Sequence, residues 1–160
     1  AAEMPEEMAE VASYTCVPIA TGERLTTKYE FARVLDARAA SILQPALGRV
    51  GGLLETKKIS AMAETRYAVM APHLYAGPIV GAANVQLATS IPNFLILESI
   101  ERWEGFHAKI LKSPMPWEGG YVIPPTAPGI GVELDEEVAR AHPYEGDDLH
   151  LGMAPDALTP

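Results

Sequence analysis

Three polar residues occupy equivalent places in the sequence, and each could take part in acid–base chemistry. Glu23, His73 and Glu98 each come shortly after a short apolar segment that is typical of a β-strand. An imidazole titrates near neutral pH and can move protons, and a carboxylate can carry a proton or bind a hard metal ion. Because the carboxyl ends of parallel strands meet at one rim, the spacing predicts that these side chains converge there.

The elements that would position these residues alternate between strand and helix. Apolar segments at 16–20, 41–44, 67–70 and 94–97 predict four strands, and helical patterns fill the stretches between them. Short strands that are apolar on both faces and separated by helices indicate a parallel sheet with crossover connections. The sequence therefore predicts an α/β fold, either a barrel or a doubly wound sheet.

Local signals mark where the helices and the later segments lie. Thr26 or Thr27 can cap the second helix, and Glu30 is placed to complete a capping box with Thr27. Beyond the fourth strand, the pattern predicts a helix within 101–112 and another within 133–141. The proline- and glycine-rich stretch between these two helices is expected to be irregular.

Composition excludes several classes of protein. The chain has 160 residues and a net charge of −9, which argues against a nucleic-acid surface. No apolar run reaches the length of about 18 residues that a membrane span needs. The acidic N-terminal residues do not resemble a signal peptide. Cys16 is the single cysteine, and its apolar flanks predict a buried thiol in a cytoplasmic protein.

Several other residues could carry chemistry but have simpler interpretations. Gly51-Gly52 before a helix could cradle a phosphate, but a tight turn explains the pair better. Trp103 and Trp117 are expected to be packing residues. The three remaining histidines lie in polar surroundings and are expected on the surface: His107, His142 and His150.

Four short motifs follow one another along the chain: Pro18-Ile19-Ala20-Thr21-Gly22-Glu23, Gln44-Pro45 with Gly48 and Gly51-Gly52, Ala71-Pro72-His73-Leu74, and Leu97-Glu98. In this order and spacing they resemble the enolase superfamily, in its mandelate racemase and muconate lactonizing enzyme branch. The acid-sugar dehydratases of the galactonate dehydratase type look nearest.

The resemblance implies a fold and a set of roles. It implies the later half of a (β/α)7β barrel, with residues 1–112 as the partial barrel and 113–160 as an irregular segment that packs toward a capping domain. By resemblance, Glu23 is the third carboxylate ligand of a Mg²⁺ ion, His73 is the general acid or base, and Glu98 stabilises an enolate. The implied reaction removes a proton α to a carboxylate, most simply in dehydrating a sugar acid to a 2-keto-3-deoxy acid.

Two departures from the family pattern shape the expectation. Ala46 stands where the family has an aspartate that orients the histidine, which weakens a racemase more than a dehydratase. The chain is also much shorter than a full barrel of about 250 residues. The expected partners are therefore the missing first half of the barrel with its capping domain, a sugar-acid substrate and further copies in a homo-oligomer. Alone, this part is expected to be inactive.

Two alternatives to a dehydratase stay open. One is a racemase or cycloisomerase of the same superfamily, acting on another carboxylic acid. The other is a non-catalytic fragment or degenerate paralogue that serves as an assembly piece, an interpretation that Ala46 would favour.

Overall fold

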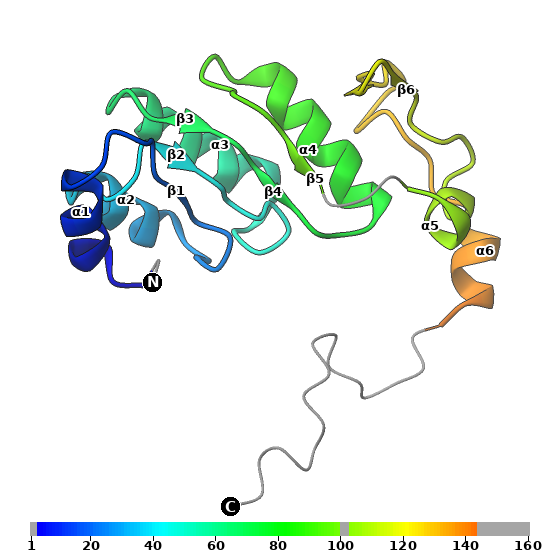
Figure 1. Cartoon of the computed structure of the whole chain (residues 1–160). Coiled ribbons are helices and arrows are strands. Elements are labelled where there is room, and N and C mark those ends of the chain that lie inside the picture. The colour runs from blue at the N-terminus through cyan, green and yellow to red at the C-terminus, as the bar shows by residue number, and fades with distance from the viewer. Residues whose placement is uncertain (1–2, 100–102, 144–160) are drawn as a thin grey trace, which may run out of the picture.

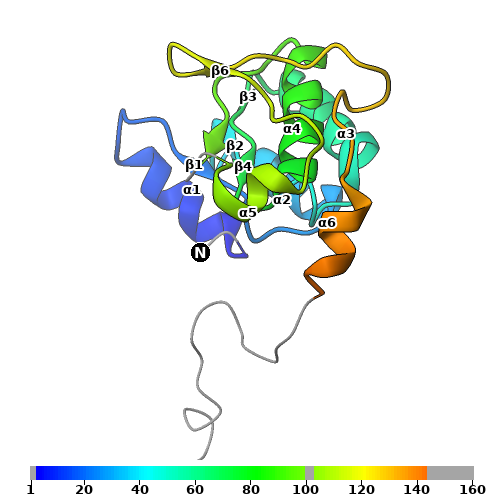
Figure 2. The ribbon, with the colours of Figure 1, turned by 90° about the vertical axis from the view of Figure 1, so that its right-hand side faces the viewer.

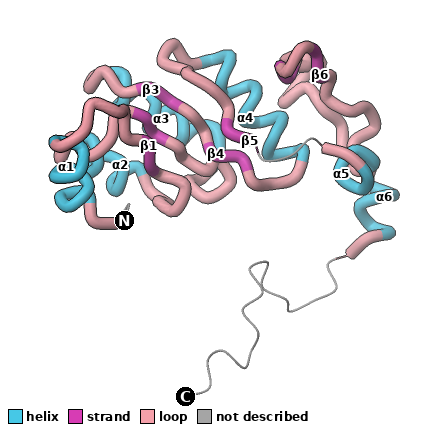
Figure 3. The backbone as a smooth tube through the Cα atoms, in the orientation of Figure 1, coloured by secondary structure: helices cyan, strands magenta, loops and turns pink. Residues whose placement is uncertain are grey.

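A computed structural model of the chain describes residues 3–99 and 103–143, in which helices are separated by one or two short strands through most of the chain (Figures 1 and 3). The elements are α1 (Pro5–Ser13), β1 (Ala20–Thr21), α2 (Lys28–Asp36), β2 (Ile42–Leu43), α3 (Gly52–Glu64), β3 (Val69–Met70), β4 (His73–Leu74), α4 (Pro78–Ser90), β5 (Glu98–Ser99), α5 (Gly105–Lys109), β6 (Trp117–Glu118), β7 (Tyr121–Val122) and α6 (Glu136–Ala141).

The strands between α1 and α5 pair in parallel, as the alternating pattern predicts. β1, β2 and β3 form one sheet in this order, with Ala20 opposite Ile42 and Ile42 opposite Val69. β4 and β5 form a second parallel pair in which His73 lies opposite Glu98. The register therefore makes neighbours of two of the three candidate residues.

Isolated parallel bridges connect the two sheets. Ala46, just beyond β2, pairs with His73, and Met70 in β3 pairs with Phe94. Pro45 and Pro72 interrupt the ladders at the points between these pairs, because proline has no N–H to donate. The result is a parallel α/β arrangement in which four segments lie side by side in sequence order.

The strands are shorter than the sequence patterns suggest. The segment expected at 16–20 is paired only at its end, in β1, and Cys16 is exposed, so the prediction of a buried thiol was wrong. The segment expected at 94–97 contributes a bridge at Phe94, and the paired strand β5 begins one residue after it. Apolar composition predicts a strand-like segment but does not define which residues find a hydrogen-bond partner.

The C-terminal part is also more regular than predicted. Gly119 and Gly120 both have positive φ, at 57° and 87°, and connect β6 to β7 in an antiparallel hairpin. Two glycines in the left-handed region suit the tight turn of a hairpin. The helix expected within 101–112 is the short α5, and α6 lies within the stretch 133–141.

The main core lies between the strands and the helices α2, α3 and α4. Figure 2 places these three helices on one side of the strands. Their inward side chains pack against Leu43 of β2 and Met70 of β3, which are both fully buried. The largest helical contributions come from Phe31, Val34, Ile59 and Leu87. Within the described residues, no helix is long and apolar enough to cross a membrane.

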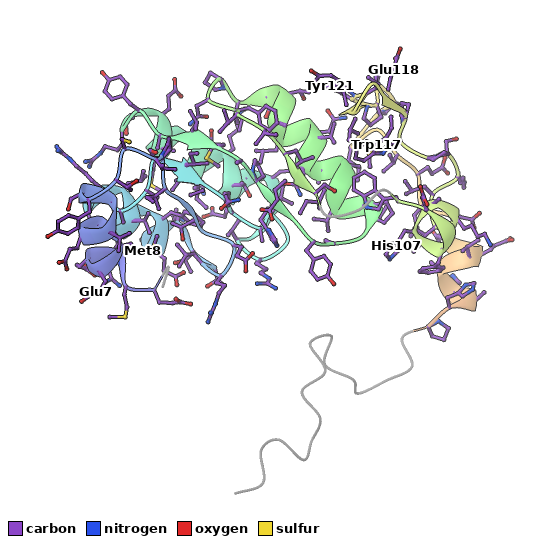
Figure 4. The ribbon with its side chains drawn as sticks, viewed as in Figure 1. Glu7, Met8, His107, Trp117, Glu118 and Tyr121 are labelled. Carbon is purple, nitrogen blue, oxygen red and sulfur yellow. The ribbon has the colours of Figure 1, made fainter. Side chains whose placement is uncertain are left out.

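A second, smaller core joins α4 to the C-terminal part. Trp103 is 8% exposed and packs with Leu74, Val85 and Met115. Its ring centroid lies 5.9 Å from that of Trp117, which supports the prediction that both tryptophans are packing residues. In Figure 4, Trp117 lies on the β6–β7 hairpin, at the opposite end of the molecule from α1.

The capping box at the start of α2 is present as predicted and gives a test of the fold. The Thr27 hydroxyl accepts a hydrogen bond from the Glu30 N–H, and the Glu30 side chain accepts one from the Thr27 N–H at 2.8 Å. Hydrogen bonds from the side chain of Thr27 and the backbone of Thr26 lower the pKa of Glu30 below its usual value of 4.5.

Replacing Thr27 with alanine is therefore expected to lower the free energy of unfolding by about 1 kcal/mol at pH 7. Because the pKa of Glu30 is lower in the folded state, the stabilisation is present above about pH 4.5 and is lost as the pH falls. Urea unfolding at pH 7 and pH 3 measures both effects. Thr89→Ala serves as control, because its exposed hydroxyl bonds a helix carbonyl within α4. A loss that is equal at both pH values would contradict the role of Glu30.

Candidate active site

The candidate site lies just beyond the carboxyl ends of β1, β2 and β3. Glu23 follows β1, Gln44 follows β2, and His73 and Glu98 are the first residues of β4 and β5. The Gln44 N–H donates to the Thr21 carbonyl at 2.8 Å, so the ends of β1 and β2 are held together. All four side chains therefore project from one rim of the parallel arrangement.

Gly22 provides the backbone conformation that connects β1 to Glu23. Gly22 has φ of +135° and lies against the ring of Phe31, where an added Cβ would come within 2.5 Å of a ring carbon and 3.2 Å of the Gln44 nitrogen. Only glycine adopts this conformation without strain and leaves room for the neighbouring chain. The Arg49 side chain also donates to the Glu23 carbonyl, at 3.4 Å.

The three residues predicted from the sequence do come together. His73 Nδ1 lies 2.9 Å from Glu98 Oε2 and 3.5 Å from Glu23 Oε2. The imidazole is largely buried, with 13% of its side chain exposed, whereas the side chains of Glu98 and Glu23 are 36% and 54% exposed. The imidazole of His73 thus lies deepest in the site, and the two carboxylates lie between it and solvent.

The hydrogen bond between His73 and Glu98 defines the tautomer of the ring. Glu98 Oε2 also accepts a hydrogen bond from the Gln44 amide, so this oxygen acts as an acceptor toward the ring and the hydrogen lies on Nδ1. In the neutral imidazole the other nitrogen, Nε2, then carries the lone pair. At 3.5 Å, Glu23 is too far for a strong second hydrogen bond to Nδ1. Glu98 is therefore the group that orients the imidazole.

Ala46 lies beside His73 through their parallel bridge and is 8% exposed. Its methyl group can accept no hydrogen bond. Ala46 therefore cannot orient His73 as an aspartate at this position would. The carboxylate that accepts the hydrogen bond from His73 is instead Glu98, the first residue of β5.

Gln44 is a site residue that sequence reasoning did not identify. Its side-chain Nε2 donates to Glu98 Oε2 at 3.0 Å, so this one oxygen accepts hydrogen bonds from both Gln44 and His73. A signal was available, because Gln44 is a polar residue at the end of a predicted strand, in the same position as the other three.

A metal ion would need more ligands than the described residues offer. Among residues 3–99 and 103–143, no group of three or more histidine, cysteine, aspartate or glutamate side chains could hold a metal ion. Glu23 offers an accessible carboxylate, which is the ligand type that Mg²⁺ prefers. One such carboxylate does not make a complete binding set.

The other candidate positions do not compete with this site. A cavity of about 640 Å³ opens at the opposite ends of the strands, near Cys16 and Tyr67, and no histidine or carboxylate lines it. His142 is exposed at the end of α6, and His107 is half-buried in α5. His150 lies outside the described residues.

Comparisons with known proteins agree with this architecture. The model of a family described as enolase C-terminal domain-like matches residues 1–138. Among solved structures, a candidate mandelate racemase/muconate lactonizing enzyme from Labrenzia alexandrii is 64% identical, with a TM-score of 0.90 over 95% of this chain and 39% of its own. A candidate galactarate dehydratase of the enolase type from Agrobacterium radiobacter, solved with sodium and L-malate, is 29% identical with a TM-score of 0.83, over 98% of this chain and 43% of its own.

Among curated proteins, the D-galactonate dehydratase of Ralstonia pickettii is 39% identical over 156 residues, which is 92% of this chain. The chain spans only 40% of the length of that relative. The matched part thus corresponds to a partial α/β barrel, and the relatives contain much that this chain does not.

Proposed function

The chain belongs to the enolase C-terminal domain-like family, and from this membership we propose that the complete enzyme dehydrates a sugar acid to a 2-keto-3-deoxy acid. The observation that carries the proposal is the meeting of Glu23, His73 and Glu98 at one rim, with His73 Nδ1 within 3.5 Å of both carboxylates. Three curated relatives that are 39–40% identical to this chain are D-galactonate dehydratases, which supports this substrate class.

His73 is proposed as the acid that protonates the leaving hydroxyl. In the imidazolium form, Nδ1–H donates to Glu98 and Nε2–H is available to the β-hydroxyl of the substrate. The Cα–H and Cβ–O bonds break, the hydroxyl leaves as water with the proton from Nε2, and a Cα–Cβ double bond forms. The resulting enol becomes the keto acid. His73 is left neutral, with its hydrogen on Nδ1, which is the tautomer described above.

Glu98 is proposed to stabilise the charge that develops when the α-proton leaves. An ionised carboxylate would repel an enediolate, so Glu98 acts with a proton on Oε1, while Oε2 accepts from its two neighbours. Hydrogen-bond donors aimed at developing charge in a partly buried site lower the barrier more than they would in water. The half-buried position of Glu98 suits this task.

Two contributions to the reaction lie beyond the described residues. We propose that Glu23 supplies one ligand to a Mg²⁺ ion whose other ligands, like the base that takes the α-proton, belong to a part of the enzyme outside this chain. A bound Mg²⁺ would polarise the substrate carboxylate and make the α-proton more acidic. Further copies of the protein in a homo-oligomer remain part of this proposal.

One observation favours a second candidate within the same family. Although Ala46 removes the usual acceptor, Glu98 holds Nδ1 of His73 at 2.9 Å and leaves Nε2 as a base in the neutral ring. A racemase or cycloisomerase, which needs an oriented base and no leaving hydroxyl, therefore remains compatible with the geometry. A non-catalytic paralogue is the alternative from another class.

A substrate screen of the intact protein separates these candidates. Purified protein with Mg²⁺ is incubated with D-galactonate, galactarate and other sugar acids, and the formation of 2-keto acid is measured. We expect keto acid from at least one sugar acid, and no product after Mg²⁺ is removed with a chelator. Exchange of the α-proton in heavy water without keto acid would favour the racemase. The absence of both signals would support the non-catalytic alternative.

A further inference from the structure

The acceptor oxygen of Glu98 has two donors, and only one of them is a proton-transfer group. Gln44 Nε2 donates to Oε2 at 3.0 Å, and His73 Nδ1 donates to the same oxygen at 2.9 Å. Gln44 lies 54 residues before Glu98 in the sequence, so the tertiary fold alone creates this contact. The amide of Gln44 is neither an acid nor a base near neutral pH, and it therefore binds Oε2 without competing for the acid–base role.

We propose that Gln44 is a positioning residue that holds Glu98 Oε2 against His73 Nδ1 and leaves Oε1 as the oxygen that meets the substrate. This inference rests on the function proposed above and extends it to a residue with no direct contact to reacting atoms. With Ala46 beside the ring, Glu98 must both orient His73 and stabilise the enolate. If Oε2 orients His73 and Oε1 meets the substrate, the carboxyl group must be kept from rotating. The hydrogen bond from Gln44 to Oε2 opposes that rotation.

The backbone around Gln44 is built to keep the amide in place. Its N–H donates to Thr21 at the end of β1, and the Pro45 carbonyl accepts from the N–H of His73 at 3.1 Å. The proline that follows also restricts Gln44 to extended backbone conformations. The side chain is half-buried and approaches Glu98 from the strand on the far side of His73. Hydrogen bonds to β1 on one side and to His73 on the other thus hold the backbone of Gln44 and limit the movement of its side-chain amide away from Glu98.

The test uses the intact protein and a measurement that needs no substrate. Nitrogen NMR of labelled histidine reports which ring nitrogen of His73 carries the hydrogen. In the wild type we expect the Nδ1–H form, which is the opposite of the tautomer that free histidine prefers in water. In Gln44→Met, which keeps the volume and removes the donors, we expect a measurable fraction of the ring to change to Nε2–H.

A matched control is available in α4. Gln86 is also half-buried. Its Nε2 donates to the carbonyls of Pro125 and Ile130, two residues that lie more than 50 positions after His73 in the sequence. Gln86→Met makes the same chemical change and is expected to leave the tautomer of His73 as in the wild type. If Gln44→Met does not fold, Gln44→Asn keeps an amide that is one methylene too short to reach Oε2, and the same tautomer change is expected.

Turnover gives the second readout. If the enzyme turns over a sugar acid, the Gln44 variants are expected to lower kcat by about 10-fold to 100-fold, with KM within a few-fold of the wild type. A wild-type tautomer of His73 in these variants would overturn the proposal, whatever their kcat. If no substrate is found for the wild type, the proposed function fails, but the NMR comparison still decides whether Gln44 positions Glu98.

Discussion

Replacing His73 with asparagine is expected to lower kcat of the intact enzyme by about 10²-fold to 10⁴-fold, which is the usual contribution of a general acid or base. Asparagine can donate a hydrogen bond to Glu98 in place of Nδ1–H, but it can neither give nor take a proton. KM should change much less, because the loss concerns the transition state more than substrate binding. Steady-state kinetics on the sugar acid found in the screen measures both constants.

The control for this experiment is a histidine outside the site. His142→Asn removes an exposed imidazole at the end of α6, where Nδ1 lies 2.9 Å from the Val138 carbonyl and the ring packs near Phe106. Its kcat is expected to equal that of the wild type. A His73→Asn enzyme that retains more than a tenth of the wild-type kcat would remove this residue from the catalytic role and leave it with a structural one.

Replacing Gly81 with valine is expected to lower the free energy of unfolding by about 2–3 kcal/mol, through overpacking of the smaller core. The glycine lies under the indole of Trp103, and an added Cβ would come within 2.2 Å of one ring carbon and 2.5 Å of another. Either the tryptophan leaves its place or α4 moves. Chemical denaturation gives the stability, and tryptophan fluorescence reports whether the ring has become exposed to water.

Gly77→Ala, at the N-cap of the same helix, is a control for replacing a glycine where there is room for a side chain. This glycine precedes α4, has an ordinary φ of −66°, and has nothing within 4 Å of an added Cβ. A change of a few tenths of a kcal/mol is expected there. If Gly81→Val were as stable as Gly77→Ala, the packing of Trp103 on α4 would not be what joins the C-terminal part to the sheet.

The packing of Trp103 also bears on the site. The tryptophan comes five residues after Glu98, and its indole N–H reaches the Ala76 carbonyl at 3.5 Å. Trp103 is thereby attached to the segment that leaves β4. A loosened tryptophan in Gly81→Val is therefore expected to lower activity as well as stability, since His73 begins β4 and Glu98 begins β5.

Much of the fold could be predicted because its signals are local. The capping box of Thr27 and Glu30 involves residues three apart, and the alternation of apolar strands with helices is visible in any window of the sequence. Parallel pairing follows from that alternation. The meeting of Glu23, His73 and Glu98 could likewise be predicted, because equivalent positions at the ends of parallel strands must lie on one rim.

Other features depended on partners far away in the sequence. Apolar residues around Cys16 suggested burial, but no element of the described chain covers them, and the thiol is exposed. The hairpin of β6 and β7 was missed because proline and glycine indicate turns without indicating what pairs on either side of them. In both cases the prediction failed because composition describes a local segment and does not identify the distant residues that would pack or pair with it.

The sequence by itself determined the α/β order, the family resemblance and the strand-end positions of Glu23, His73 and Glu98. Only the tertiary structure decided that Glu98 Oε2 accepts a hydrogen bond from His73 Nδ1 and that Gln44 donates to the same oxygen. The physical reason is range: caps and periodicity act within one or two helical turns. A hydrogen bond between residues 25 or 54 positions apart exists only when strand register brings them together.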